Sequence, residues 1–265
     1  MIDKMHMIAN YHTHTTRCRH GHNNDPDKVF VETAIERGLK ILGFSDHAPI
    51  PFKGGYVSDA RMYFELLEDY VDSVRKLQKE YEKDIQILLG IELEYYPEYH
   101  ESIMNYARDY NFDYFILGQH FLGNEIGETY VSDLPADKNH ITRYVDQVIE
   151  GLRTNTFTYI AHPDIIKDYG YTELYTEQMR RLCRVANEYD VPMELNFVGY
   201  RCGRHYPNDL FWKVAGEEGC KMVLGSDAHT PEHLAIPDEI AYGHQMAEKF
   251  NLKLVDTVEL KRPWI

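Results

Sequence analysis

The chain has 265 residues, of which 43% are hydrophobic, so it is long enough to bury the core of one large domain. Asp and Glu number 43 against 28 Lys and Arg, for a formal net charge of -15 at pH 7. This excess of negative charge argues against nonspecific binding to a nucleic-acid backbone or to an anionic membrane surface. The N-terminal stretch is too polar for a secretory signal and no run approaches a membrane span, so we expect a cytoplasmic protein.

Cysteine and histidine usage narrows the chemistry further. The four cysteines are scattered without a Cys-x-x-Cys pair, which favours free thiols in a reducing compartment over a disulfide framework. The chain also has 14 histidines, dispersed along its length rather than gathered in a run. Because histidine is the commonest metal ligand and the usual acid or base near neutral pH, the placement of these residues matters.

Short apolar segments alternate with longer segments of helical spacing along the chain. The predicted strands are residues 7–11, 41–45, 85–93, 112–118, 158–161, 192–197 and 221–225, with a weak eighth candidate at 252–260. The predicted helices are residues 26–37, 59–83, 98–109, 138–153, 176–189, 208–218 and 231–249. We expect Asp59 and Thr176 to be N-caps, and Gly38 and Gly219 to lie just beyond helix C-termini.

This alternation implies a parallel sheet covered by helices. The runs ILLGIEL and MVLGSD are nearly continuous in apolar residues, as is typical of strands buried on both faces. No linker or low-complexity tract divides the chain, so we expect a single domain over residues 1–265. Seven or eight strand–helix units favour a closed or nearly closed β/α barrel, and a doubly wound open sheet is the alternative.

Six of the first seven predicted strands end in, or carry, a side chain that can bind a metal. In chain order these are His12 and His14, Asp46 and His47, Glu92, His120, His162, and Asp227 and His229, while His20 lies in the first loop. The carboxyl ends of barrel strands form one face, which carries the active site. Residues i and i+2 of a strand point to the same side. His12 and His14 can therefore face one cavity together, and so can Asp227 and His229. A shared metal site explains all of these strand ends together.

The segments YHTHTTRCRHG, GLKILGFSDHAP, LLGIELEYYPEY, LGQHFL, AHPDIIK and VLGSDAHTP resemble the polymerase-and-histidinol-phosphatase (PHP) superfamily, and within it the histidinol-phosphate phosphatase branch. The resemblance runs from about Tyr11 to Pro231. It implies a distorted (β/α)7 barrel of the TIM type, with a trinuclear metal site at the C-terminal ends of the strands.

The resemblance also implies three groups of metal ligands. The first group is His12, His14, Glu92 and Asp227; the second is Glu92, His120 and His162, with the glutamate bridging; the third is His20, His47 and His229. His22 adds an imidazole to the loop of His20, and we expect it to face solvent. We expect Cys18, between His14 and His20, to be a small structural thiol rather than a ligand.

The implied cofactors are three divalent ions. The mixture of imidazole and carboxylate suits zinc as first choice, with iron or manganese as alternatives. The second and third groups have three protein ligands each, which leaves positions open for water and substrate. In the implied reaction, a water that bridges two ions loses a proton and becomes the nucleophile.

Arginines are the candidates for holding a phosphate. Residues 194–207 resemble the family segment in which an asparagine is followed by a glycine, an arginine and Tyr-Pro. Arg201 matches the arginine that the family assigns to the phosphate, which gives it a catalytic and substrate-binding role, and Arg204 is a second substrate-binding candidate. Arg17 and Arg19 in the first loop are reserve contacts.

The activity implied by the resemblance is hydrolysis of L-histidinol phosphate to L-histidinol and phosphate, a step of histidine biosynthesis. The expected partner is therefore a small phosphate monoester, not a nucleic acid or a membrane. One alternative is another PHP-type phosphoesterase, either a phosphotyrosine-protein phosphatase or a nucleic-acid phosphodiesterase; the net charge of -15 counts against the latter. A non-catalytic metal-binding module is a further alternative, which the open coordination positions disfavour.

Overall fold

The computed structural model describes residues 6–20 and 24–264. Within these residues eight strands run parallel in one sheet, and each pairs with its neighbour in the chain, in the order β1 to β8. The strands are β1 (Ala9–Asn10), β2 (Ile41–Phe44), β3 (Gln86–Leu93), β4 (Tyr114–Leu117), β5 (Tyr159–Ile160), β6 (Met193–Asn196), β7 (Lys221–Gly225) and β8 (Lys253–Leu254). A doubly wound sheet reverses its strand order part-way, so the sequential order excludes that alternative.

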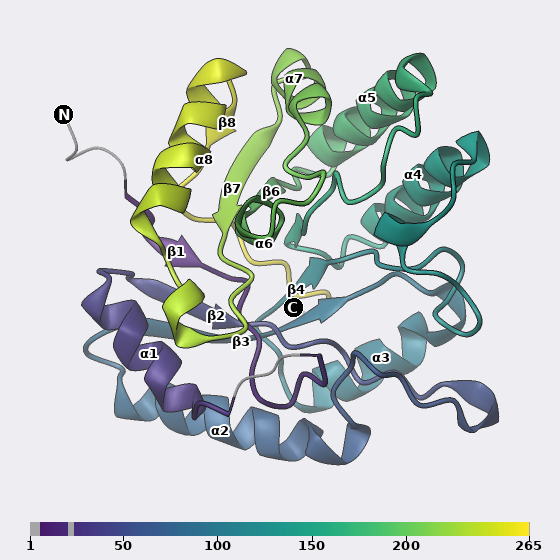
Figure 1. Ribbon diagram of the computed structural model, residues 1–265. Helices are drawn as coiled ribbons and strands as arrows, with labels where there is room; N and C mark the ends of the chain where they lie inside the picture. The colour runs from purple at the N-terminus through teal and green to yellow at the C-terminus, as the bar shows by residue number, and fades with distance from the viewer. Residues whose placement is uncertain (1–5, 21–23, 265) are drawn as a thin grey trace.

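The helices follow one another around the strands (Figure 1). They are α1 (Asp27–Glu36), α2 (Leu67–Glu80), α3 (Pro97–Asp109), α4 (Lys138–Arg153), α5 (Thr172–Glu188), α6 (Phe197–Arg201), α7 (Asp209–Glu217) and α8 (Pro237–Lys249), with short 3-10 turns at Lys53–Gly55, Phe64–Leu66, Val131–Asp133 and Pro231–His233. Each longer helix buries one stripe against the sheet; in α4 the stripe contains Ile141, Tyr144, Val145 and Val148. This arrangement confirms the predicted distorted β/α barrel. None of the helices in the described residues is long and apolar enough to cross a membrane.

The barrel closes at its C-terminal rim through a seam between the segments that follow β1 and β7. Thr13 and Ala228 form a parallel bridge there. The amide of His14 donates to the carbonyl of Ala228 over 2.9 Å, and the amide of Ala228 donates to the carbonyl of His12 over 3.2 Å. The predicted eighth strand, residues 252–260, is reduced to the two residues of β8, which pair with the first two residues of β7.

A small apolar cluster fills the inside of the barrel, apart from the main core beneath the helices. Its buried members are Ala9, Tyr11, Leu88, Tyr114, Ile116, Tyr159, Ala161 and Val223. The hydroxyl of Tyr114 donates to the carbonyl of Tyr11 over 2.6 Å and lies 3.1 Å from the carbonyl of Phe44, so this buried polar group is satisfied. Val258 and Leu260 pack against the cluster. Since Lys261 and Arg262 then bond to Thr158 and Asp113, just before β5 and β4, this C-terminal segment covers the N-terminal end of the barrel.

The structure corrects three predicted helix starts. The helix predicted at 231–249 begins at Pro237, after a separate 3-10 turn at Pro231–His233. α2 begins at Leu67 and is preceded by the 3-10 turn at Phe64–Leu66, so Asp59 is not its N-cap and residues 59–63 of the predicted helix are not helical. That part instead carries Arg61 into a buried ion pair with Glu125, 2.6 Å between Nε and Oε2, and this tertiary contact overrides the helical pattern. Thr176 lies inside α5, where its hydroxyl donates to the carbonyl of Thr172 over 2.7 Å. The glycine predictions were right, because Gly38 and Gly219 adopt φ of 82° and 68° just beyond α1 and α7.

Candidate metal centre

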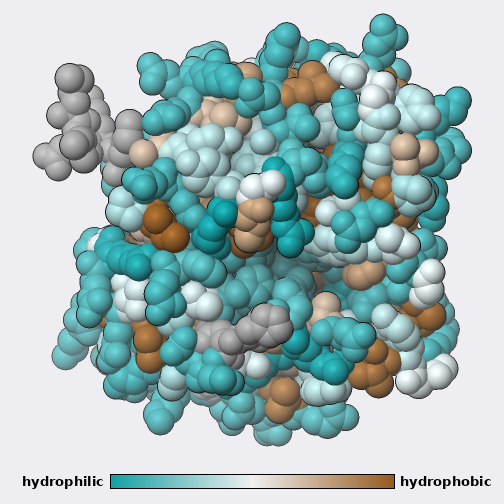
Figure 2. Space-filling view, viewed as in Figure 1, coloured by the Kyte–Doolittle hydropathy of each residue, from teal (hydrophilic) through white to brown (hydrophobic). Residues whose placement is uncertain are grey.

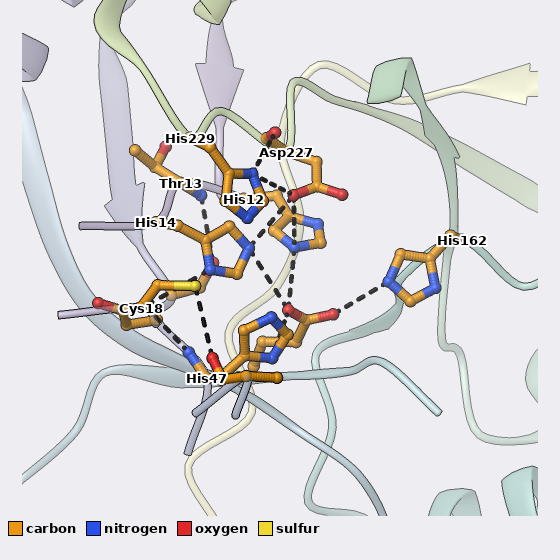
Figure 3. A network of polar contacts seen from close by, with 12 residues as sticks. His12, Thr13, His14, Cys18, His47, His162, Asp227 and His229 are labelled. Atoms are coloured by element: carbon orange, nitrogen blue, oxygen red, sulfur yellow. Dashed lines mark hydrogen bonds and ion pairs between the residues drawn. The ribbon is translucent and has the colours of Figure 1, made fainter. Parts of the chain in front are cut away.

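A cavity of about 510 Å³ opens at the C-terminal ends of the strands. Figure 2 shows that this face of the molecule is hollowed near its middle. The cavity is lined by eight of the nine side chains predicted as metal ligands, namely His14, His20, His47, Glu92, His120, His162, Asp227 and His229. The ninth, His12, is fully buried beside them. In Figure 3 the labelled histidines and Asp227 come from several segments of the chain and point toward one another.

The first predicted group forms a compact cage. His12 Nε2 lies 3.3 Å from Glu92 Oε2 and 3.6 Å from Asp227 Oδ1. His14 Nε2 lies 3.5 Å and 3.2 Å from the same two oxygens. Ligand atoms about 2.0–2.1 Å from a tetrahedral zinc ion lie roughly 3.3 Å from each other. His12 Nε2 and Asp227 Oδ1 are also buried without a hydrogen-bond partner among the described residues, which is rare unless an ion or water satisfies them.

The second group uses the other oxygen of Glu92. His162 Nε2 lies 3.0 Å from Glu92 Oε1, and His120 Nε2 lies 3.5 Å from the same atom. One carboxylate thus faces two sets of imidazoles with its two oxygens, as a bridging ligand does. Gly118 makes this placement possible, because a Cβ at that position would overlap the carboxylate of Glu92.

The third group brings the Nε2 atoms of two tilted imidazoles close together. His20 Nε2 and His229 Nε2 lie 2.9 Å apart. The Nδ1 atoms lie 3.1 Å and 3.3 Å from the carbonyls of Ala60 and Asp227, and because a carbonyl only accepts, each Nδ1 carries the hydrogen. Both Nε2 lone pairs then face each other, an arrangement that a cation between them relieves. His47 Nδ1 lies 3.2 Å from Glu92 Oε2 and so connects this group to the first.

His22 lies outside the described residues, so the structure does not test its expected exposure.

Two predicted ligands adopt a backbone conformation that residues other than glycine rarely take. His162, just beyond β5, has φ of 31°, and Asp227, just beyond β7, has φ of 45°. Residues held at positive φ cost roughly 1–3 kcal/mol each and cluster at functional sites.

Carboxylates behind the cage orient the imidazoles. Glu194 Oε1 lies 2.8 Å from His12 Nδ1, and Glu94 Oε1 lies 2.7 Å from His120 Nδ1. Such contacts fix the tautomer in which Nε2 is free to bind a metal. We did not predict these two carboxylates. Two features of the sequence could have indicated them: Glu94 follows Glu92 at the i+2 spacing, and Glu194 interrupts the apolar run of β6.

The buried charges depend on each other. Burial raises the pKa of Glu92 and of Asp227, but the surrounding imidazoles outweigh it and hold both pKa values well below the usual range. Burial lowers the pKa of His12, and the nearby carboxylates Asp227, Glu194 and Glu92 reverse this and raise it. Burial lowers the pKa of His47 well below 6.5. A bound cation would oppose protonation of every imidazole here.

The PHP domain model matches residues 10–197, which include seven of the nine predicted ligands. The chain belongs to the PHP domain family. This PHP protein is 27% identical to a Deinococcus radiodurans protein named probable histidinol-phosphatase, over 84% of this chain and 87% of the relative. It is 24% identical to the histidinol-phosphatase of Bacillus subtilis, over 82% of this chain and 92% of that one.

A solved structure supports the same fold. The histidinol phosphate phosphatase of Lactococcus lactis, solved in complex with Zn, L-histidinol and phosphate, aligns with a TM-score of 0.72. The alignment covers 96% of this PHP protein and 99% of the other chain, at 17% sequence identity.

The two predicted phosphate-binding arginines of the PHP protein line the cavity but differ in their partners. Arg201, on α6, donates from Nε and Nη2 to Glu239 over 2.8 Å and 2.9 Å. Nη2 also donates to the carbonyl of Ser226 over 3.2 Å. This holds the guanidinium in place and leaves Nη1 without a partner in the described part of the chain. Arg204 is exposed, and its side chain has no hydrogen bond or ion pair within residues 6–20 and 24–264.

The reserve arginines lie elsewhere. Arg17 pairs with Asp27 over 2.9 Å and with Asp69 over 2.7 Å, and it does not line the cavity. Arg19 donates to the carbonyl of Ser58 and is also absent from the wall. A different arginine, Arg61, does line the cavity, and we did not predict it because its local sequence is helical in pattern.

Proposed function

We propose that this PHP protein is a metal-dependent phosphomonoesterase that hydrolyses L-histidinol phosphate to L-histidinol and phosphate in histidine biosynthesis. The observation that carries the proposal is the convergence of donors from six strand ends on one cavity. A purely structural metal site needs no adjoining cavity of this size. The names of the curated relatives, and the bound molecules of the Lactococcus lactis protein, supply the substrate.

The donor set fits divalent ions, because it combines partnerless buried nitrogens and oxygens with carboxylates whose pKa values are held low. We assign the first ion to His12, His14, Glu92 and Asp227, the second to Glu92, His120 and His162, and the third to His20, His47 and His229. Zinc is our first choice, with iron or manganese as alternatives. Such ions, when bound, lower the pKa of water and stabilise negative charge on phosphoryl oxygens.

The protein's own residues supply orientation and selectivity. Glu194 and Glu94 hold the imidazoles of His12 and His120 in the tautomer that leaves Nε2 free. Arg201 and Arg204 present guanidinium groups to the same cavity, where they bind phosphate oxygens. Positioning and electrostatic stabilisation account for most of the catalysis of phosphoryl transfer, so these are the contributions that matter.

The test is a substrate panel. The purified protein, loaded with zinc, is assayed against histidinol phosphate, a phosphotyrosine peptide, nucleotides and single-stranded DNA. We expect histidinol phosphate to have the highest kcat/KM and chelated protein to be inactive. A higher kcat/KM for the phosphotyrosine peptide would replace this proposal with the protein-phosphatase alternative, and metal-loaded protein that hydrolyses nothing would support a non-catalytic module.

A further inference from the structure

Cys18 lies inside the ring of histidines. Its side chain is only 1% exposed. Its Sγ could hold an ion together with ring nitrogens of His14 and His229, or with those of His20 and His47, because the donor atoms of each set all lie within 4.8 Å of one another. Figure 3 shows the sulfur of Cys18 beside the ring of His14.

The sulfur lies against the ring of His20, a proposed ligand of the third ion. It is 3.2 Å from Nδ1 and 3.6 Å from Nε2 of this imidazole. A thiolate about 2.3 Å and an imidazole nitrogen about 2.05 Å from a tetrahedral zinc ion lie roughly 3.6 Å apart, so the sulfur is within the range of donors that share an ion. His20 Nε2 also faces His229 Nε2 at 2.9 Å, which brings the sulfur and two imidazoles together in one small volume.

A structural role explains this placement poorly. A small thiol retained for packing would lie among apolar side chains. Here the sulfur contacts imidazoles, with His20 Nδ1 at 3.2 Å, and the carbonyl of Ala60 is farther away, at 3.7 Å. That carbonyl is already approached by His20 Nδ1 at 3.1 Å and by the amide of Arg19 at 3.3 Å. His14 Nδ1, in the same cluster, is buried without a hydrogen-bond partner among the described residues.

We propose that Cys18 is a thiolate ligand of the third ion, together with His20, His47 and His229. This inference rests on the proposed metal centre, and it reverses our expectation from the sequence. On binding, the thiol loses its proton to solvent and a sulfur–metal bond forms. The third site then has four protein donors, so the positions open to water and substrate belong to the second site. A soft thiolate also favours zinc over manganese or magnesium at this position.

The first test uses cobalt as a spectroscopic substitute for zinc. Cobalt-loaded protein should show a thiolate-to-cobalt charge-transfer band in the near ultraviolet. Cys18→Ser should lose that band and keep the visible d–d bands of the remaining sites. Cys202→Ser is the matched control, because Cys202 also lines the cavity and is exposed, and this variant should keep the charge-transfer band. Cys18→Ser should also weaken binding of one ion by more than the roughly 10–100-fold typical of losing an outer contact.

The second test needs no variant and therefore does not depend on Cys18→Ser folding. Zinc X-ray absorption of the parent protein should contain a sulfur neighbour at about 2.3 Å. Fully loaded protein with no sulfur neighbour, or a cobalt band that Cys202→Ser abolishes and Cys18→Ser keeps, would overturn the inference. Hydrolysis of histidinol phosphate, measured on the same samples, is a separate result: loss of that activity with the sulfur signal intact would count against the proposed function alone.

Discussion

Glu92 is the side chain on which the proposed centre most depends. Its carboxylate lies within 3.5 Å of a ring nitrogen of each of five histidines, His12, His14, His47, His120 and His162. Both of its oxygens are used, and Gly118 leaves the space in which they sit. A single neutralised carboxylate here would therefore disturb more than one ion.

We expect Glu92→Gln to keep the fold, to lose at least one ion and to lower kcat/KM by roughly 10³-fold or more, because the loss of even one stabilising group at a reacting centre costs about 10²–10³. Circular dichroism, elemental analysis and histidinol phosphate kinetics check these points. His120→Ala should act in the same direction, mainly through the second ion. Glu128→Gln, at an exposed site, is the control. Near-parental activity of Glu92→Gln would show that the bridge is assigned wrongly.

Substitutions of Arg201 test how the phosphate is bound. We expect Arg201→Ala to retain all the ions and to lower kcat/KM by roughly 10²–10³, the cost of one strong donor. Arg201→Lys should restore only part of this, since an ammonium lacks the planar fork. Arg204→Ala should cost less. Because Arg201→Ala also leaves the buried carboxylate of Glu239 unpaired, thermal unfolding of each variant must be measured alongside the kinetics.

If Arg201→Ala turned over histidinol phosphate at the parent rate and affinity, the phosphate role would pass to Arg204. Glu239→Gln separates the two functions of Arg201. It frees the guanidinium without removing it, so it should change stability more than kcat/KM.

At the scale of elements, strand ends were predictable and helix starts were less so. The runs that form β3 and β7 are apolar on both faces, and this burial leaves their polar end residues conspicuous in the sequence. Residues 59–63 have a helical pattern as well, yet the ion pair between Arg61 and Glu125 holds them in another conformation. That pair joins segments far apart in the chain, and so does the pair between Arg201 and Glu239. Periodicity reports only local neighbours, and for this reason it could not reveal either pair.

The start of α7 is linked to a buried carboxyl. Asp164 Oδ2 accepts a hydrogen bond from the amide of Asn208 over 2.6 Å, and Asn208 caps α7. Burial raises the pKa of Asp164 from 3.8 to about 6. The folded state thus favours the neutral form, and the stability that this gives is lost as the pH rises through 6.

Asp164→Asn keeps an acceptor for the amide and removes the charge. At pH 8 the variant should be more stable than the parent by about 3 kcal/mol, from about two pKa units at 1.36 kcal/mol each. The difference should shrink towards zero near pH 4. Urea unfolding at both pH values and at equal metal content measures it. If the difference in the free energy of unfolding between variant and parent is the same at both pH values, Asp164 does not titrate in this range.

For the whole molecule, the sequential barrel places donors from residues 12 to 229 on one rim, although no two strands share a close sequence repeat. We expect elemental analysis of protein purified without chelator to approach three divalent ions per chain, because the donors divide into three groups. Full activity in a well-occupied sample that holds one ion would reject the trinuclear proposal. The nine candidate ligands could be predicted from their strand-end positions and the family resemblance. The supporting role of the carboxylates Glu94 and Glu194 could not, because it depends on which strands lie next to each other.

The seam between β1 and β7 has a further consequence for dynamics. The hydrogen bonds that close the barrel are made by His12, His14 and Ala228. His12 and His14 are proposed ligands of the first ion, and Ala228 directly follows another of its ligands, Asp227. Opening of this seam would therefore release the ion, and loading of the ion would hold the seam shut. Hydrogen–deuterium exchange at the amides of His14 and Ala228 should then slow steeply as the first site fills, while amides in the middle of α5 should exchange at an unchanged rate.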